Sequence, residues 1–393
     1  MRLSEWKEVA LNSLVQYGRS IAYGVVQPRD NVLDGVPIIK VNDIINGLID
    51  IKRLNKTTYK IEGKYKRTRL RGGELIISLV GTVGKCAIVP INFAGCNLVR
   101  AVASVPIENA LYSKWVYYYF QSARGKEYID ARLNTTVQPT FNLKDLASML
   151  IPMPEDKTID FSVKLLSCLD DKIELNNRIN KSLEEMAHAI FKSWFVEFEP
   201  FQDGEFEDSE LGRIPKGWRV GMLGDILTLN YGKSLTSNKR IDGKIRVYSS
   251  AGITGFHNQA LINEPSIIVG RKGTIGSVYY STEPSFCIDT AYYATQKDSR
   301  FPLLLMYQFL QELKLNHYNE DSAVPGLNRN TVYAINIIIP PEPILKQYSE
   351  NLSSIYSLIF DNINQTKTLV AIRDILLPKL MSGEIRVPIE EVQ

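Results

Sequence analysis

A long uninterrupted helix pattern is the feature that most constrains what this 393-residue chain can fold into. Over residues 161–196, apolar or amide side chains recur at alternating steps of three and four, and neither Gly nor Pro interrupts them. Such steps are typical of an α-helix with one continuous seam, close to a coiled coil. A helix of about 35 residues would be roughly 50 Å long at 1.5 Å per residue. The segment therefore predicts a spacer or a pairing surface.

The same pattern returns near the C-terminus at a constant offset of 186 positions, which relates Leu183 to Leu369 and Asn176 to Asn362. A single Asn in an apolar seam lowers stability but fixes the register of a helix pair. Two unrelated amphipathic helices are the alternative, and the shared offset favours a duplicated unit instead. The predicted seam residues are Leu169, Asn176, Ile179, Leu183, Met186, Ile190, Ile355, Leu358, Asn362, Leu369, Ile372 and Leu376.

Short apolar runs between turn residues precede each helix and predict strands. In the first half these runs are residues 36–41, 74–80 and 87–89, and residues 110–121 predict a helix. Four patches recur in both halves: residues 6–9 match 218–220, 17–20 match 231–234, 81–85 match 273–277, and 136–142 match 322–328. A proline-rich exit stands before each long helix, as suits a sharp helix start. The chain therefore reads as module, helix, module, helix.

Charge is distributed unevenly along the chain. Residues 1–155 carry 21 Lys/Arg against 13 Asp/Glu, residues 156–210 carry 6 against 14, and residues 211–343 carry 14 against 10. Residues 344–393 carry 5 against 6. Two basic modules on a neutral-to-acidic frame indicate polyanionic partners. The chain shows no signal-peptide core and no apolar run long enough for a membrane span, so we expect a cytoplasmic protein without membrane contact. The four Cys and three His lack zinc-finger spacing, and we expect no metal site.

DNA contact is predicted first for the segment 52–71, where nine cations face a single acid. Such a charge run can also be a solvated face, but the interleaved Thr and Tyr favour phosphate contact. Arg19, Lys233 and Arg271 flank Gly-containing turns and are the first candidates for reading bases. The full set of predicted DNA-binding residues is Arg19, Ser20, Lys56, Lys60, Lys64, Lys66, Arg67, Arg69, Lys85, Lys233, Ser234, Arg271 and Lys272.

Catalytic motifs are missing from the sequence. The stretches GTVGK and GTIGS lack the spacing of a P-loop, and a turn between two strands is the better interpretation. We find no adenine-methyltransferase motif, no glycine-rich S-adenosylmethionine loop after a strand, and no convincing nuclease cluster. The chain is therefore predicted to catalyse nothing alone and to hold no cofactor.

Three stretches, together with the repeat, resemble the specificity subunit of type I restriction-modification systems. They are LLPKLMSGEIRV at residues 376–387, SELGRIPKGWRVGMLGDI at 209–226, and NRINKSLEEMAHAIFKSWFVEFEPF at 177–201. The resemblance implies an α+β fold in which two long antiparallel coiled-coil helices separate two similar mixed α/β target-recognition domains with pseudo-twofold symmetry. The implied segments are domain 1 (1–155), a central helix (156–198), a linker (199–217), domain 2 (218–343), a C-terminal helix (344–380) and a tail returning toward domain 1 (381–393).

The resemblance also implies the function. Each domain would read one half of a split double-stranded DNA target, and the helices would set the gap between the halves. Two modification subunits would bring S-adenosylmethionine and adenine methylation, and restriction subunits would add ATP- and Mg-dependent translocation and cleavage. A type IIB-like methylating system and a standalone DNA-binding coiled-coil protein are the alternatives.

Overall fold

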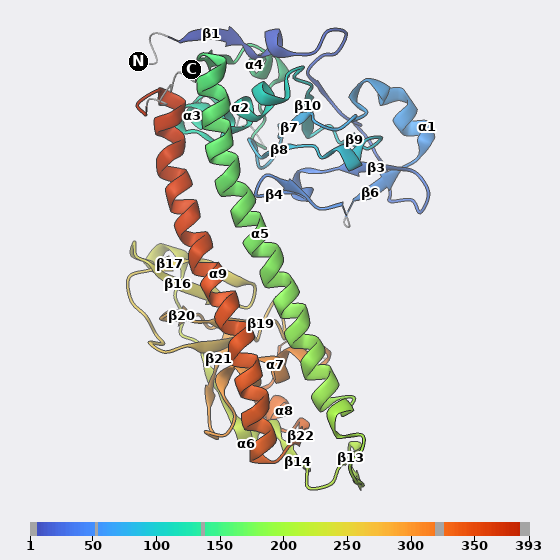
Figure 1. Ribbon diagram of the computed structural model, residues 1–393, viewed down its shortest axis with the longest axis vertical. Coiled ribbons are helices and arrows are strands. Elements are labelled where there is room, and N and C mark those ends of the chain that lie inside the picture. Colours follow the sequence, from blue (N-terminus) through green and yellow to red (C-terminus); the bar gives the residue numbers. More distant parts are fainter. Residues whose placement is uncertain (1–5, 52–53, 135–137, 319–325, 386–393) are drawn as a thin grey trace, which may run out of the picture. The chain divides into compact units, whose positions relative to one another are not determined.

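The computed structural model describes residues 6–51, 54–134, 138–318 and 326–385 of the chain. It divides into two units, the first formed by residues 1–175 and 365–393 and the second by residues 176–364. Each unit therefore combines one module with a part of both long helices (Figure 1).

The first unit contains a four-stranded sheet in the order β2-β10-β7-β8, a three-stranded sheet in the order β6-β3-β9, and the pairs β1-β11 and β4-β5. Its strands are β1 (Lys7–Ala10), β2 (Ala22–Tyr23), β3 (Val36–Ile39), β4 (Ile44–Ile45), β5 (Leu48–Ile49), β6 (Asn55–Thr57), β7 (Leu75–Ser78), β8 (Cys86–Ile88), β9 (Asn97–Leu98), β10 (Val102–Val105) and β11 (Leu150–Met153). Its short helices are α1 (Tyr59–Glu62), α2 (Ala110–Gln121), α3 (Ala123–Asp130) and α4 (Leu143–Ala147). Helix α2 has the predicted bounds, and its buried Trp115 and Phe120 join the core over the larger sheet.

The second unit repeats this arrangement with a four-stranded sheet β15-β21-β18-β19, a three-stranded sheet β17-β16-β20 and the pair β14-β22. Its strands are β14 (Arg219–Met222), β15 (Leu227–Tyr231), β16 (Ile245–Ser249), β17 (Gly252–His257), β18 (Ser266–Gly270), β19 (Val278–Ser281), β20 (Ser285–Cys287), β21 (Ala291–Gln296) and β22 (Asn336–Ile339). Its short helices are α6 (Leu223–Ile226), α7 (Leu303–Glu312) and α8 (Arg329–Tyr333). The predicted duplication is therefore confirmed at the level of sheet topology.

Matching hydrogen bonds give the residue equivalence between the two modules. Phe141 N donates to Leu79 O at 2.8 Å in the first module, and Leu327 N donates to Arg271 O at 2.9 Å in the second. This equivalence agrees with the predicted match between residues 81–85 and 273–277. Both stretches are turns between two strands, as expected, with positive φ at Gly81 and Gly273.

The predicted match of residues 17–20 to 231–234 is wrong. Tyr231 pairs with Tyr292 of β21, and the same place in the first module is taken by Tyr23, which pairs with Ala103 of β10. Lys233 N donates to Cys287 O, as Val25 N does to Leu98 O, so Lys233 corresponds to Val25. Between β1 and this tyrosine, the first module is four residues longer than the second. Because Tyr17-Gly18 has the same two residues as Tyr231-Gly232, the sequence alone suggested the wrong match.

The two long helices are α5 (Asp156–Phe195) and α9 (Glu342–Ser382). In the first unit, Arg373 donates to Asp170 at 2.9 Å, and Leu166 shares a core with Leu377. In the second unit, Asn362 Nδ2 donates to Asn180 Oδ1 at 2.9 Å. Residue numbers rise along one helix as they fall along the other, so the pairing is antiparallel within each unit, as expected. Asn180 joins the predicted Asn176 and Asn362, since Asn176 Nδ2 donates to Asn362 O at 3.5 Å.

Part of the predicted seam is wrong because each helix half also packs on its own module. Ile179, Met186, Leu358 and Ile372 are exposed, with Met186 at 52% and Leu358 at 56%. The buried stripe of α5 in the second unit instead runs through Ala187, Phe191 and Phe195, which pack against the module core. The other predicted positions lie on the covered side of their helices: Leu169, Asn176, Leu183, Ile190, Ile355, Asn362, Leu369 and Leu376. Asn176 is fully buried, and the others are partly buried.

The acidic segment predicted as a linker forms a hairpin of β12 (Phe206–Ser209) and β13 (Gly212–Pro215). Gly212 takes a positive φ of 97° in its turn, and Phe206 packs against the core of the second unit. Composition alone suggested a linker because acidic residues predominate in this segment. Its few apolar contacts can be recognised only in the folded structure. At the other end of the chain, Ile385 packs against the core of the first unit, and residues 386–393 of the predicted tail lie outside the described part.

Candidate nucleic-acid interface

The predicted basic segment of the first module forms helix α1 and the 3-10 turn Gly63–Thr68 that follows it. Thr58 caps the helix by accepting from Ile61 N at 3.3 Å. The cations Lys60, Lys64, Lys66 and Arg67 are all exposed on this element. The element therefore presents a group of accessible positive charges, while Lys52 and Arg53 of the same predicted segment lie outside the described residues.

Arg69, at the end of this segment, is held by a buried carboxylate. Its Nε donates to Glu62 Oε1 at 2.7 Å, and the Glu62 side chain is fully buried. The hydrogen bonds from Arg69 lower the pKa of the Glu62 carboxyl. Lys56 is also engaged, since its Nζ donates to Leu33 O at 3.2 Å. Arg69 therefore has an internal partner, and because its side chain is still 43% exposed, its contact with DNA stays a prediction.

Arg19 is also paired with a glutamate inside the module. Its Nη1 lies 2.8 Å from Oε1 of Glu74, and the two side chains are only 11% and 2% exposed. An arginine held this far inside the module is unsuited to reading a base edge. Ser20 beside it is exposed and Lys85 is half-buried next to the turn at Gly81, so both stay predictions.

The second module gathers its predicted residues at the end of the four-stranded sheet. Arg271 and Lys272 directly follow β18, and Lys233 and Ser234 lie shortly after β15. Strands β15 and β18 lie on either side of β21 in the sheet. Lys233, Ser234 and Lys272 are exposed. Arg271 is half-buried, and its guanidinium carbon lies 4.9 Å from the ring centre of Tyr231.

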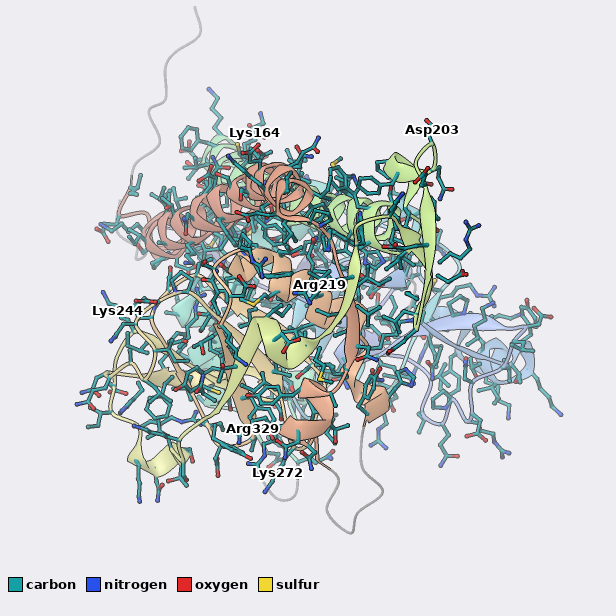
Figure 2. The ribbon with its side chains drawn as sticks, turned by 90° about the horizontal axis from the view of Figure 1, so that it is seen from below. Lys164, Asp203, Arg219, Lys244, Lys272 and Arg329 are labelled. Carbon is teal, nitrogen blue, oxygen red and sulfur yellow. The ribbon has the colours of Figure 1, made fainter. Side chains whose placement is uncertain are left out.

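Arg329 belongs to the same cluster and was missed in the sequence. Its guanidinium carbon lies 5.3 Å from the ring centre of Tyr231, the last residue of β15. Arg329 and Lys272 are labelled at the same side of the unit in Figure 2. The available signal was that the repeated patch ending at Asn328 is followed by Arg329, whereas the matching patch ending at Asn142 is followed by Leu143.

Two tyrosines with fixed hydroxyl groups, the buried Tyr292 and the half-buried Tyr333, pack beside this cluster. Burial raises the pKa of Tyr292 to about 12, so its hydroxyl stays neutral and donates to Leu327 O at 2.9 Å. The hydroxyl of Tyr333 accepts from Leu229 N at 2.8 Å. Both rings are thereby fixed before any ligand arrives, which reduces the entropy lost on binding.

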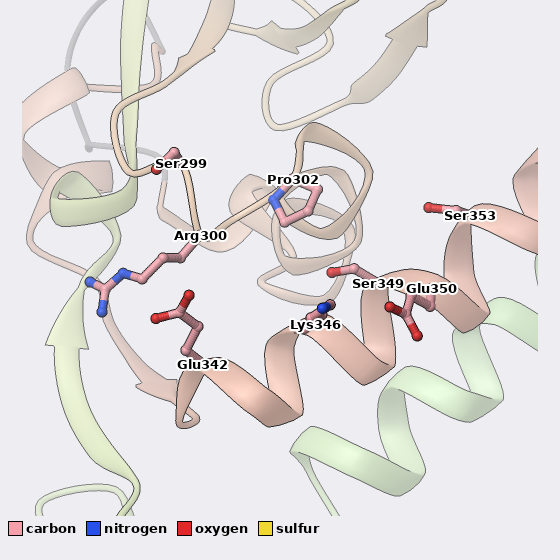
Figure 3. A pocket seen from close by; sticks show the side chains of 8 residues that line it. All are labelled: Ser299, Arg300, Pro302, Glu342, Lys346, Ser349, Glu350 and Ser353. Carbon is pink, nitrogen blue, oxygen red and sulfur yellow. The ribbon is translucent and has the colours of Figure 1, made fainter.

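A cavity of about 500 Å³ lies elsewhere in the second unit, between the loop before α7 and the first turns of α9 (Figure 3). Its lining mixes Glu342 and Glu350 with Arg300 and Lys346, and Arg300 is paired with Asp298. Two carboxylates at its wall make this cavity a poor phosphate site. Among the described residues, no cluster of His, Cys, Asp and Glu could hold a metal, and no helix has the length and apolar character needed to cross a membrane.

Comparison with known proteins gives a consistent result. The family model of the type I restriction modification DNA specificity domain matches residues 3–185 and again residues 215–371. The MjaIX specificity subunit of Methanocaldococcus jannaschii is 28% identical over 309 residues, covering 71% of each chain. The HindI specificity subunit of Haemophilus influenzae is 24% identical over 98% of this chain and 100% of its own.

A solved type I restriction-modification S subunit from M. genitalium has the same fold. It matches 96% of each chain with a TM-score of 0.56 at 17% sequence identity. The two matches of the family model coincide with the two copies of the module and its following helix. The chain therefore belongs to the type I restriction-modification DNA specificity family, whose role is target recognition and not catalysis.

Proposed function

We propose that this chain reads a bipartite DNA target for a type I restriction-modification complex, with one half-site for each module. The main support for this proposal is that the same fold occurs twice in the chain and that the two copies differ in surface chemistry. The first module presents the exposed cations of residues 60–67. The second presents arginines backed by tyrosines at the end of its sheet. Identical frames with different surfaces suit the recognition of two different sequences.

The exposed apolar side chains of the long helices are proposed to bind two modification subunits. On α5 these include Leu175, Ile179 and Met186, which share one stripe of the helix. On α9 they include Leu358, Ile372 and Ile375, the last being 60% exposed. Several large apolar side chains that stay exposed on the same two helices favour a protein interface. The modification subunits would supply S-adenosylmethionine, and restriction subunits would supply ATP- and Mg-dependent steps.

Co-expression with the cognate modification subunit tests this proposal. We expect a stable complex with two modification subunits per chain, which methylates adenine in both halves of one split sequence. Met186→Asp and Leu358→Asp should reduce the recovered modification subunit at least tenfold, because each places a charge on the apolar stripe. Lys181→Asp, at an exposed polar position of α5, is the matched control and should leave recovery unchanged. A chain that binds DNA but recovers no modification subunit would instead support a standalone DNA-binding protein.

A further inference from the structure

We propose that Arg271 and Arg329 form a guanine-reading pair in the second module, with Tyr231 as the shared platform between them. This inference rests on the proposed function and deepens it. It assigns the base class that one module recognises, and it adds Arg329 as a specificity-determining residue.

The geometry places two guanidinium groups on one tyrosine ring. The Arg271 and Arg329 guanidinium carbons lie 4.9 and 5.3 Å from the centre of the Tyr231 ring. Each arginine also approaches a second ring, with Arg271 5.7 Å from Tyr292 and Arg329 5.8 Å from Tyr333. The Tyr231 side is accessible, since this residue is 50% exposed. Aromatic contacts orient both guanidinium planes at an open edge of the module.

Their charges are not neutralised within the module. Among the described residues, neither arginine forms an ion pair, and Arg271 Nη1 donates to the backbone oxygen of Asp289 at 3.2 Å. The buried Nε of Arg329 has no acceptor among these residues. Two neighbouring cations without a carboxylate repel each other, and an incoming electron-rich ligand would relieve that repulsion. Arg19 and Arg69 of the first module differ in this respect, because each is paired with a buried glutamate.

The first module carries apolar side chains at the equivalent places. Arg271 corresponds to Leu79 through the matched hydrogen bonds of the two folds. Arg329 follows the cap of α8 as Leu143 follows the cap of α4. Tyr292, the second ring beside Arg271, corresponds to Ala103 in the strand register. The arginines are therefore not required by the fold, and they distinguish what the second module binds.

The chemistry of the pair selects guanine. An arginine fork donates two parallel hydrogen bonds to O6 and N7 of guanine, the commonest specific contact in the major groove. Lys272 and Lys233 flank the pair as exposed point charges and suit phosphate oxygens. We thus expect one or two G·C pairs in the second half-site that depend on Arg271 and Arg329.

Selection from a randomised duplex library tests the inference, using the full chain in its complex with the modification subunit. Arg329→Lys and Arg271→Lys keep the charge and remove the planar fork. We expect each variant to bind the preferred duplex with a preference for guanine reduced about 10- to 100-fold at one position of the second half-site, with the first half-site unchanged. Lys272→Gln is the matched control, and it should weaken binding to all sequences alike and reduce the salt dependence by about one ion.

Two results would overturn the inference. If both lysine variants keep the wild-type sequence preference, the arginines contact phosphates or no DNA. If either variant loses affinity equally for all sequences, as expected for Lys272→Gln, the arginine contacts the DNA backbone and reads no base. Thermal unfolding of each variant confirms that the module is folded. A wild-type complex that selects no bipartite sequence would refute the proposed function itself, which separates that failure from failure of the arginine pair.

Discussion

At the residue scale, cations in the first module serve two different purposes. Arg69 and Glu62 anchor the basic element to the module, and Asn97 Nδ2 completes the network by donating to Glu62 Oε1 at 3.1 Å. Lys60, Lys64, Lys66 and Arg67 remain exposed on the same element. The anchoring pair holds the accessible charges in position for a polyanion.

Removing the anchor should destabilise the first module. Arg69→Met leaves the buried Glu62 carboxylate without its main partner, and we expect a loss of about 2 kcal/mol in the free energy of unfolding. The value lies below that of a fully buried pair because the Arg69 side chain is 43% exposed and solvent screens it. Chemical denaturation measures the change. Lys64→Met, on the exposed side, is the control and should change stability by less than about 0.5 kcal/mol.

The same pair predicts a dependence on pH. The pKa of Glu62 is lowered in the folded chain, so the unfolded chain takes up a proton first as the pH falls. The stabilisation is complete above the unfolded pKa and is lost as the pH falls through the folded pKa, below about pH 4.5. Glu62→Gln should flatten this part of the stability curve. A variant with the same acid-induced loss as the wild type would contradict this assignment.

At the element scale, the two long helices pair through polar contacts as well as apolar ones. Asn176, Asn180 and Asn362 bond to one another across the pair in the second unit, and Asp170 bonds to Arg373 in the first. Polar contacts of this kind are directional and fix one register. The periodicity in the sequence predicted the helices, their length and two of the asparagines.

It could not predict which apolar positions are covered, because that depends on the module packed beside each helix. Ala187 and Phe191 face the module core, while Met186, directly before Ala187, faces solvent. The sequence likewise could not separate free from paired arginines, since Glu74 and Glu62 reach their partners only in the fold. The positions of several strands and the two glycine turns were more predictable, because they follow local patterns in the sequence.

Lengthening both helices together should lengthen the unread gap in the DNA target. Four residues inserted after Leu175 and four after Thr366 lie between the Asn contacts and the Asp170–Arg373 contact, so both sets are kept. The insertion adds roughly 6 Å of helix, which is less than two base pairs at about 3.4 Å each. We expect the methylated motif of the variant to keep both half-sites and to gain one or two unread pairs. Insertion into α5 alone is the control, and it should disturb the pairing and reduce methylation.

At the scale of the whole molecule, duplication separates the frame from the specificity. The two modules share sheet order, strand register and the positions of their long helices, and they differ in the side chains at the sheet ends. A frame of this kind allows one recognition surface to change while the other stays the same. We therefore expect each module to read its own half-site.

Exchange of one module tests this claim most directly. Residues 218–335 are replaced by the equivalent domain of a family member with a different target, and the methylated motif is sequenced in cells that carry the complex. We expect one half of the motif to change to that of the donor protein, while the other half stays the same. A motif in which both halves change, or in which neither does, would contradict it.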